Sequence, residues 1–337
     1  MLKFVVRRLF LLIPILFGLS IFVFLFVHAL PGDPASALLG ERGTPEAVER
    51  LRQQLGLDRP VWDQYLSFIG SYATGDLGSS VRSRQPIIDE ILLYFPATLE
   101  LAVVAILFAT AFGIPLGIIS AKRRGSPIDN GALIMSLIGI SIPIFFLGLV
   151  LKFVFSVQLG WLPSVGRYDL REYGDVPAVT NLRTVDCLLA ASPGCFGDAV
   201  GHLILPAITL GSIPLAIIAR ITRSSVVEVL NEDYVRTAHA KGLSERAIDR
   251  RHVLRNAMIP IATVIGLQAG LLLSGAILTE RVYAWGGIGT WLYNGLGAKD
   301  YPVILAGILF LAIIFVLVNL AVDVWYAFLN PRIRYAS

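Results

Sequence analysis

The sequence predicts an all-α polytopic membrane protein with six transmembrane helices, and three observations predict it. The 337 residues are 55% hydrophobic and 15% charged, against about 25% charged in a typical soluble domain. Apolar runs of 18 or more residues recur along the chain, as membrane-spanning helices require. Charged side chains are sorted out of these runs, which contain only Glu100, Lys152 and Asp323. This composition excludes an ordinary cytosolic enzyme.

Each predicted span is long enough to cross the bilayer as a helix. About 20 residues at a rise of 1.5 Å cover roughly 30 Å of hydrocarbon. Helices are required, because backbone amides in lipid must be hydrogen-bonded within the protein. The predicted spans are 9–30, 97–121, 131–157, 202–219, 259–279 and 302–329, of which the fourth is the shortest.

Basic residues orient the predicted bundle. Lys3, Arg7 and Arg8 precede the first span, and Lys122 and Arg123 follow the second. Cytoplasmic flanks of membrane helices carry an excess of Lys and Arg, so both termini are predicted to be cytoplasmic. The predicted divisions are a tail and first span over 1–30, an extracytoplasmic helical loop domain over 31–96, a core transmembrane domain over 97–329 and a cytoplasmic tail over 330–337. Within the core, 158–201 forms an outer loop and 220–258 a cytoplasmic loop.

The predicted outer domain contains two helix signals. Thr44 can cap a helix that has Pro45 at its first position. After Pro60, apolar residues recur at helical spacing and give a second helix one apolar face. Two interpretations stay open for this domain: a structural cap on the bundle, and a docking surface for an external partner.

Both cysteines of the chain, Cys187 and Cys195, lie in the outer loop 158–201. An outward-facing pair in an oxidising compartment favours a disulfide, which would contribute about 2.5 kcal/mol in the chain-entropy model. The alternative is two free thiols packed among apolar neighbours. No cluster of histidines lies near them in the sequence, so no metal site is predicted.

The cytoplasmic loop 220–258 is predicted to form a helix, a glycine turn and a second helix. Asn231 can cap the first helix, and Gly242 can end it in the left-handed conformation. The second helix then leads into the fifth span. The small residues Ala238 and Ala240 leave room for close approach by another protein, which favours a cytoplasmic partner with a groove for this helix. The alternative is a solvated basic face.

These features resemble the permease subunits of ABC importers, and within them the dipeptide, oligopeptide and nickel subgroup. The family's cytoplasmic loop has E-A-A, three residues, Gly, nine residues and I-x-L-P. Gly242 matches its Gly, and Arg236, Thr237 and Ala238 occupy the E-A-A positions. YVRTAHAKGLSE followed by RHVLRNAMIP is similar to the peptide subgroup's own version. Further matching stretches are LPGDPA at 30–35, LGLDRP at 55–60, GDLGSS at 75–80, GWLPSVG at 160–166 and NPRIRY at 330–335.

The resemblance implies a type I ABC importer permease fold and a transport subunit rather than an enzyme. Such a subunit forms half of the translocation pathway for a peptide-type substrate, a di- or oligopeptide or a glutathione-like molecule, across the bacterial inner membrane. Its implied partners are a second homologous permease, two cytoplasmic ATPases, an extracytoplasmic binding protein and the lipid bilayer, with no nucleic acid. The residues implied to couple to an ATPase are Tyr234, Arg236, Thr237, Ala238, Ala240, Lys241 and Gly242.

The sequence lacks the G-x-x-x-x-G-K-S/T pattern that cradles ATP phosphates. ATP and Mg are therefore expected in the partner ATPases, with no cofactor bound by this chain. An ion-coupled secondary transporter is the main alternative, although the two similar halves typical of that class are not found. A membrane scaffold, or an ABC permease for nickel chelates or opines, is also considered. Polar residues within the spans are candidates for lining a translocation path, namely Gln268, Asn319 and Asp323.

Overall fold

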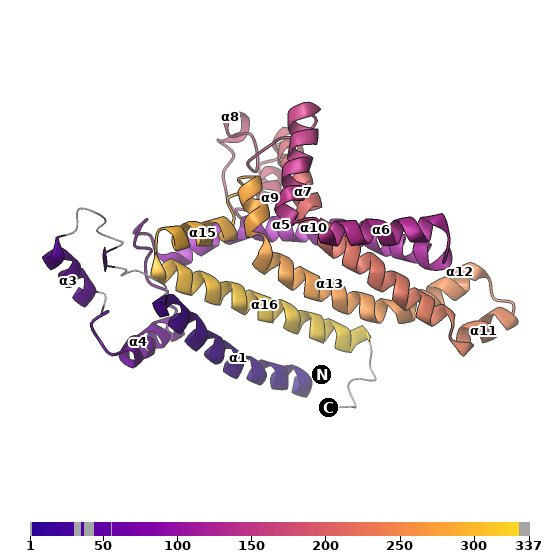
Figure 1. Cartoon of the computed structure of the whole chain (residues 1–337), viewed down its shortest axis with the longest axis horizontal. Coiled ribbons are helices and arrows are strands. Elements are labelled where there is room, and N and C mark those ends of the chain that lie inside the picture. The colour runs from indigo at the N-terminus through magenta and orange to yellow at the C-terminus, as the bar shows by residue number, and fades with distance from the viewer. Residues whose placement is uncertain (1, 30–34, 37–43, 55, 330–337) are drawn as a thin grey trace.

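The computed structural model of the chain describes residues 2–29, 35–36, 44–54 and 56–329. This part consists of helices and connecting turns, with an isolated β-bridge between Ser79 and Pro86. Five long helices run alongside one another (Figure 1) and have the length and hydropathy to cross a membrane. They are α1 (Leu2–Ala29), α5 (Ile87–Lys122), α10 (Pro193–Leu230), α13 (Arg255–Gly275) and α16 (Tyr301–Leu329). The prediction of an all-α polytopic membrane protein is confirmed.

Helices α5 and α10 form the centre of the bundle because small residues let them approach closely. On α5, Ala105, Gly113 and Gly117 recur on one face at steps of four or eight residues. A Cβ atom at Gly117 would lie 2.5 Å from the carbonyl oxygen of Ala219, and one at Gly113 would lie 3.0 Å from that of Leu215. Helices in lipid gain no hydrophobic stabilisation by packing together, so the close van der Waals contact that small residues allow stabilises the pair instead.

The third predicted span, 131–157, is bent rather than straight. It consists of α6 (Pro127–Ser141) and α7 (Ile144–Leu151), which continues as the π-helical segment η2 (Lys152–Gln158). The two parts meet at an angle of 104°. Pro143 explains the break, because proline has no amide proton and holds the preceding residue in an extended conformation. We call α7 with η2 the arm; it projects from the side of the bundle (Figure 1).

The predicted outer domain has the two expected helices, α3 (Pro45–Gln54) and α4 (Val61–Ala73), at one end of the bundle (Figure 1). The amide of Ala47 donates to Thr44 Oγ1 over 3.3 Å, so Thr44 caps α3 as predicted. Helix α4 packs on α1 through Tyr65, whose hydroxyl lies 2.9 Å from Ser20 Oγ. Its Trp62 remains exposed.

The predicted boundary at 96/97 does not exist as a break in the structure. Helix α5 starts at Ile87 and continues through Pro96. The segment before Pro96 is also helical, but it contains the charged residues Asp89 and Glu90. The predicted span was defined by its apolar residues and therefore began too late. The outer domain and the core therefore share one helix. The tail 330–337, the NPRIRY stretch and the LPGDPA stretch apart from Ala35 lie outside the described residues.

Candidate functional site

The segment predicted to couple to an ATPase lies at the end of the bundle opposite α3 and α4 (Figure 1). It consists of α11 (Asp233–Ala240), a turn and α12 (Glu245–Ile248). Gly242 has a φ of 75°, which is the left-handed conformation predicted for the turn. Asn231 does not cap α11 as predicted; it ends α10, and its side-chain amide donates to the carbonyl of Val227 over 2.9 Å. The residue before α11 is Glu232.

One face of α11 is buried against the ends of the long helices. Val235 and Ala238 are 1% and 4% exposed and pack in a cluster with Ala121 of α5, Val226 of α10 and Ala257 of α13. The small side chain of Ala238 thus lets α11 approach its own bundle and is not offered to a partner. Close-packed interiors have low compressibility and transmit strain. The cluster therefore couples the position of α11 to three long helices.

The opposite face of α11 and the turn are exposed. The Arg236 guanidinium lies 3.4 Å from the carboxylate of Asp233; the two side chains are 73% and 95% exposed, so this ion pair contributes little stability. Thr237 donates a hydrogen bond of 2.9 Å to the carbonyl of Asp233 within its own helix. The predicted residues on this exposed surface are Tyr234, Arg236, Thr237, Ala240, Lys241 and Gly242.

Polar contacts that the sequence did not reveal fix this segment to the spans. Asn256 donates a hydrogen bond of 2.9 Å to the hydroxyl of Tyr234. Lys122, at the end of α5, forms an ion pair with Asp249, directly after α12. The partners lie far apart in the chain, and single exposed charges in a basic loop carry no signal of pairing.

A second missed group, Asp129, is buried nearby between α5, α6 and α10. Its carboxylate accepts from Nη2 of Arg223 over 2.8 Å and from the amide of Gly125 over 2.9 Å, and Ser120 also donates to it. The carboxylate binds both Nε and Nη2 of the guanidinium, the strong bidentate arrangement. It holds the start of α6 to α10, two turns before α10 ends.

Two of the predicted path residues, Gln268 and Asn319, are not brought together. Gly266 and Gly270 of α13 face α16, since added Cβ atoms would meet Val322 and Phe315. Gln268 is two residues from each glycine, about 200° around the helix, so it faces away from α16. Asn319 of α16 donates to its own helix, to the carbonyl of Phe315 over 2.9 Å. The side chain of Asp323 lies outside the described residues.

At the opposite end, a buried carboxylate organises the turn at 285–289. Glu280 of α14 (Ile277–Val282) is fully buried and accepts from the hydroxyl of Thr98 and, over 2.8 Å, from the amide of Thr290. Thr290 lies in the first turn of α15 (Ile288–Gly297), where a negative charge is favoured by the helix dipole. Gly287 is required here, because a Cβ atom would lie 2.3 Å from Glu280 Oε1.

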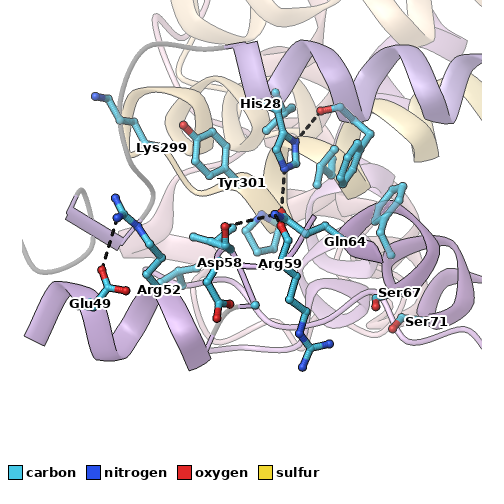
Figure 2. Close-up of a pocket in the computed structure, with 18 residues that line it drawn as sticks. His28, Glu49, Arg52, Asp58, Arg59, Gln64, Ser67, Ser71, Lys299 and Tyr301 are labelled. Atoms are coloured by element: carbon cyan, nitrogen blue, oxygen red, sulfur yellow. Dashed lines mark hydrogen bonds and ion pairs between the residues drawn. The ribbon is translucent and has the colours of Figure 1, made fainter. Parts of the chain in front are cut away.

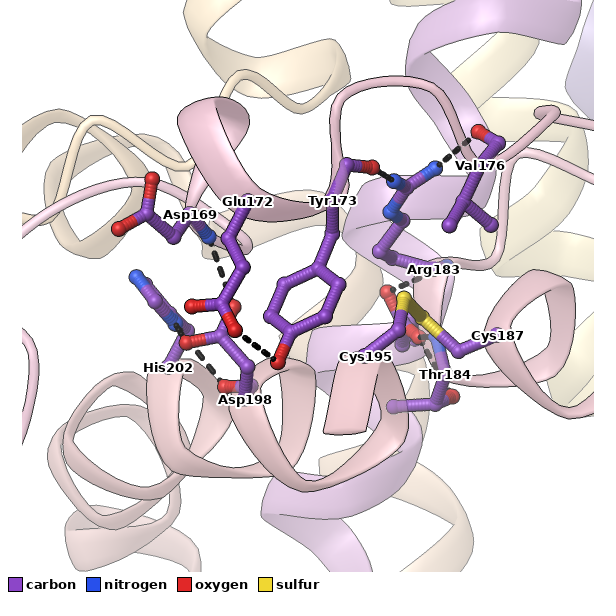
Figure 3. The surroundings of a disulfide bond; sticks show 11 residues. Asp169, Glu172, Tyr173, Val176, Arg183, Thr184, Cys187, Cys195, Asp198 and His202 are labelled. Carbon is purple, nitrogen blue, oxygen red and sulfur yellow. Dashed lines mark hydrogen bonds and ion pairs between the residues drawn. A yellow bond between two sulfur atoms is a disulfide. The ribbon is translucent and has the colours of Figure 1, made fainter. Parts of the chain in front are cut away.

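The predicted outer loop 158–201 forms a compact unit held by a disulfide between Cys187 and Cys195 (Figure 3). Both cysteines are completely buried, and their Cα atoms are 5.4 Å apart. The bond joins α9 (Arg183–Leu189) to the first turn of α10. Arg183 supports it by donating to the carbonyls of Val176 and Tyr173.

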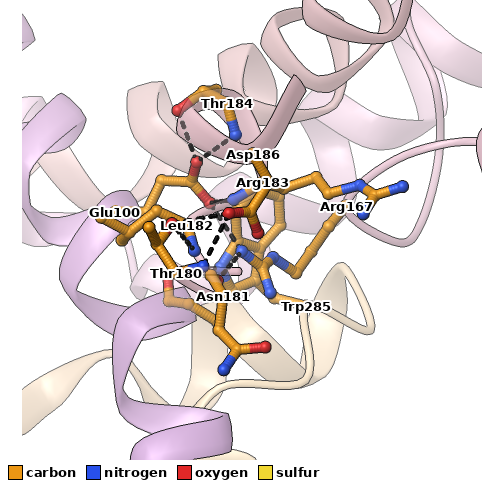
Figure 4. A network of polar contacts seen from close by, with 10 residues as sticks. Glu100, Arg167, Thr180, Asn181, Leu182, Arg183, Thr184, Asp186 and Trp285 are labelled. Atoms are coloured by element: carbon orange, nitrogen blue, oxygen red, sulfur yellow. Dashed lines mark hydrogen bonds and ion pairs between the residues drawn. The ribbon is translucent and has the colours of Figure 1, made fainter. Parts of the chain in front are cut away.

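Glu100 of α5 anchors this unit to the bundle (Figure 4). It accepts 2.8 Å hydrogen bonds from Nη2 of Arg167 and from the amide of Thr184 at the start of α9. A charged residue inside a predicted span therefore has a structural role: it caps α9 and balances Arg167.

A cavity of about 820 Å³ lies between α1, α4 and α16 (Figure 2). His28 of α1 lies 3.1 Å from Oε1 of Gln64, whose amide nitrogen donates to the carbonyl of Arg59 over 2.8 Å. These contacts tie the end of α1 to the turn before α4. The cavity also borders Lys299 and Tyr301, next to the start of α16.

Comparisons with known proteins decide what this bundle is. Residues 113–335 match the family described as the inner membrane component of binding-protein-dependent transport systems, and residues 1–102 match the N-terminal part of the same component. This chain belongs to that family. Its resemblance to an ABC importer permease of the dipeptide and oligopeptide subgroup is confirmed, and it is a multi-pass inner-membrane transport component.

Several relatives match this family member over its whole length. A di/tripeptide transport system permease of Pseudomonas aeruginosa is 50% identical over 99% of both chains. A dipeptide transport system permease of Escherichia coli is 49% identical over 99% of both chains. A glutathione transport system permease of Escherichia coli is 45% identical over 99% of this chain and 100% of the relative.

A solved structure supports the fold. The methionine ABC transporter in an inward-facing conformation matches with a TM-score of 0.53 and 19% identity, covering 72% of this chain and 98% of that chain. The match confirms the type I permease fold.

Proposed function

We propose that this chain is the permease subunit of an ATP-driven importer for small peptides and forms half of its translocation pathway. The observation that carries the proposal is the full-length identity of 45–50% to permeases of di/tripeptide, dipeptide and glutathione transport systems. Glutathione is itself a small peptide, so the three names agree on one substrate class.

The exposed surface around Tyr234, Arg236 and Gly242 docks in a groove of a cytoplasmic ATPase in this proposal. A short helix with a buried inner face and an exposed outer face suits a helix-in-groove contact. ATP and Mg are bound by that partner. Closure of the ATPases pushes α11, and the buried cluster with Val235 and Ala238 carries the push into α5, α10 and α13. The bundle then alternates between two states that the ATPases bias.

The complete transporter in this proposal contains a second homologous permease, two ATPases and an extracytoplasmic binding protein. Both termini and α11 face the cytoplasm, as the basic flanks of the first two spans indicate. The α3–α4 end then faces outward, where the binding protein delivers the substrate.

The test is purification of the intact transporter from native membranes in mild detergent, followed by uptake in vesicles. We expect the ATPases to co-purify, and ATP to drive uptake of a dipeptide that other di- and tripeptides inhibit. Arg236→Glu should release the ATPases, whereas Arg171→Glu, a change at another exposed arginine, in the predicted outer loop, should not. Repeated recovery without an ATPase would contradict the importer. Uptake of a nickel chelate or an opine but of no peptide would contradict the substrate class.

A further inference from the structure

The cavity between α1, α4 and α16 lies where two membrane-spanning helices end. His28 borders it in the last turn of α1, and Tyr301 borders it at the start of α16. The apolar stretch of α1 runs to Ala29, and that of α16 begins at Tyr301. The exposed Trp62 of α4 fits this depth, because tryptophan is enriched where hydrocarbon meets the lipid headgroups. The cavity therefore lies at the boundary between lipid and water.

Packing fixes the walls of this cavity. The ring centroids of Phe24 of α1 and Phe68 of α4 are 5.7 Å apart. Val27 of α1 is buried in one cluster with Ile304 of α16. Gln64 joins the end of α1 to the turn before α4. Three helices held together in this way enclose about 820 Å³, a volume typical of sites for small molecules.

The lining of the cavity changes from apolar to charged along the direction of the spans. Phe24, Val27 and Leu305 line it from within the apolar stretches of α1 and α16. The lining residues that come from α3 and from the loops outside the spans include five charged ones, namely Glu49, Arg52, Asp58, Arg59 and Lys299. Figure 2 shows Glu49, Arg52 and Lys299 at one side of the cavity. A ligand with a charged head and an apolar chain matches this change.

Positive charge exceeds negative charge at the charged end. Three of its five charged side chains are cationic, and the carboxylate of Glu49 already lies 3.5 Å from Arg52. The backbones of the other two cations are fixed. The carbonyl of Arg59 accepts a 2.8 Å hydrogen bond from α4, and Lys299 directly precedes Asp300, which is 2% exposed. Arginine and lysine are the side chains that hold phosphate groups, so this end suits a phosphate headgroup.

The cavity lies at the edge of the bundle and not at its centre. Among the described residues, its lining comes from α1, α3, α4, α16 and the loops beside them, and includes none from α5, α10 or α13. Helix α1 lies at the edge of the row of long helices in Figure 1. A ligand therefore reaches this cavity from the surrounding lipid more directly than from the middle of the bundle, where a transported substrate would pass.

We infer that the cavity binds a phospholipid, with its phosphate at the charged end and its acyl chains beside Phe68 and Leu305, the half-buried members of the apolar wall. This inference goes beyond the proposed function and does not rest on it, because it depends only on the membrane position of α1 and α16.

The test is photolabelling of the intact transporter in vesicles of phosphatidylethanolamine and phosphatidylglycerol. The probe is phosphatidylglycerol with a diazirine in its acyl chain, and peptide mass spectrometry locates the adducts. Phe10, which is 67% exposed at the other end of α1, reports labelling by bulk lipid. We expect Phe68 and Leu305 to be labelled at probe concentrations too low to label Phe10. Labelling no stronger at Phe68 and Leu305 than at Phe10 would overturn the inference.

Charge variants test the headgroup contact. Arg59→Gln with Lys299→Gln should lower labelling of the cavity by roughly 10-fold, the effect of losing about one charge-assisted hydrogen bond. The control is Arg50→Gln with Arg84→Gln, at exposed arginines that do not line the cavity. Arg84 has a φ of 60°, close to the 54° of Lys299. The control should label like the unmodified protein; equal labelling in both double variants would contradict the role of the charges and overturn the headgroup assignment.

Competition separates a phospholipid from other ligands. Unlabelled phosphatidylglycerol should prevent labelling of the cavity, whereas glycerophosphoglycerol, the same headgroup without acyl chains, should not. Equal competition by glycerophosphoglycerol would assign the site to a soluble phosphate, and competition by a dipeptide would assign it to the substrate; either result overturns the inference. Uptake measured in the same vesicles keeps the two proposals apart. Peptide uptake without selective labelling refutes the lipid site alone, and selective labelling without uptake supports the lipid site while the proposed function fails.

Discussion

Ser80 donates a hydrogen bond of 2.7 Å to Oδ2 of Asp300, although 220 residues separate them. The same oxygen accepts from the amides of Val81 and Arg82 over 3.0 and 3.1 Å. Asp300 is 2% exposed and directly precedes α16. One carboxylate therefore fixes the loop before α5 to the start of α16.

Asp300→Ala should destabilise the protein by roughly 2–4 kcal/mol, because it removes charge-assisted hydrogen bonds and leaves donors of the 80–82 loop unpaired. Thermal unfolding in detergent measures the effect. Asp76→Ala is the matched control, since this carboxylate is exposed and, among the described residues, accepts a hydrogen bond from the amide of Gly78 alone. Equal losses in the two variants would show that the 80–82 loop is not held by Asp300.

Glu280 and Thr98 should behave as one unit. Glu280→Gln replaces an acceptor-only group by one with an amide donor, which must face Thr98 or the Thr290 amide, and should cost about 1–3 kcal/mol. Thr98→Val removes the hydroxyl that donates to Glu280 and accepts from the amide of Ile288. In a double-mutant cycle the two losses should be coupled by more than about 0.5 kcal/mol. Strictly additive losses would contradict the network.

Asp129→Asn should destabilise the protein more than loss of an exposed ion pair at the same end, because it leaves the Arg223 guanidinium without its charged, bidentate partner. The exposed fractions of the two side chains are 2% and 23%. Asp249→Asn breaks the more exposed pair with Lys122 at the same end and should cost at most about 1 kcal/mol. Denaturation of the purified protein measures both losses of stability. A larger loss for Asp249→Asn than for Asp129→Asn would contradict the prediction.

Gly242→Val should uncouple ATP hydrolysis from uptake while the transporter still assembles. A β-branched residue in the left-handed conformation costs roughly 1–2 kcal/mol and would distort the turn between α11 and α12. No atom lies within 4 Å of an added Cβ, so the effect is one of backbone conformation alone. Gly75, with a φ of 83° and equally open surroundings, is the control at the α3–α4 end. Gly75→Val should leave the ratio of uptake to ATP hydrolysis unchanged; normal uptake in Gly242→Val would refute the role of the turn.

The double variant Cys187→Ser, Cys195→Ser should lose about 2.5 kcal/mol of stability in the outer loop unit, the entropy of the short closed loop. Proteolysis of the loop reports this loss. Thiol titration of the denatured, unreduced protein should find no free thiol, and two after reduction. Two thiols before reduction would contradict the bond.

Hydropathy predicted the long helices correctly because the requirement for internal backbone hydrogen bonds in lipid acts on each run of residues separately. Local signals also predicted the cap at Thr44 and the turn at Gly242. The sequence missed the bend at Pro143, since proline is tolerated inside α5 and α10 and only packing decides where it breaks a helix. The structural roles of Asp129 and Glu280 were also not predicted, because their hydrogen-bond partners lie on other helices.

The sequence by itself determined the membrane environment, the helical class, the family and the segment that turns at Gly242. Each of these depends on residues close together in the chain, where backbone geometry and transfer from water to lipid act. The tertiary structure alone decided that Ala238 is buried, that Gln268 and Asn319 do not converge, and that the arm leaves the bundle. Those features depend on close approach of residues up to 220 positions apart, and helix periodicity carries no information about such distances.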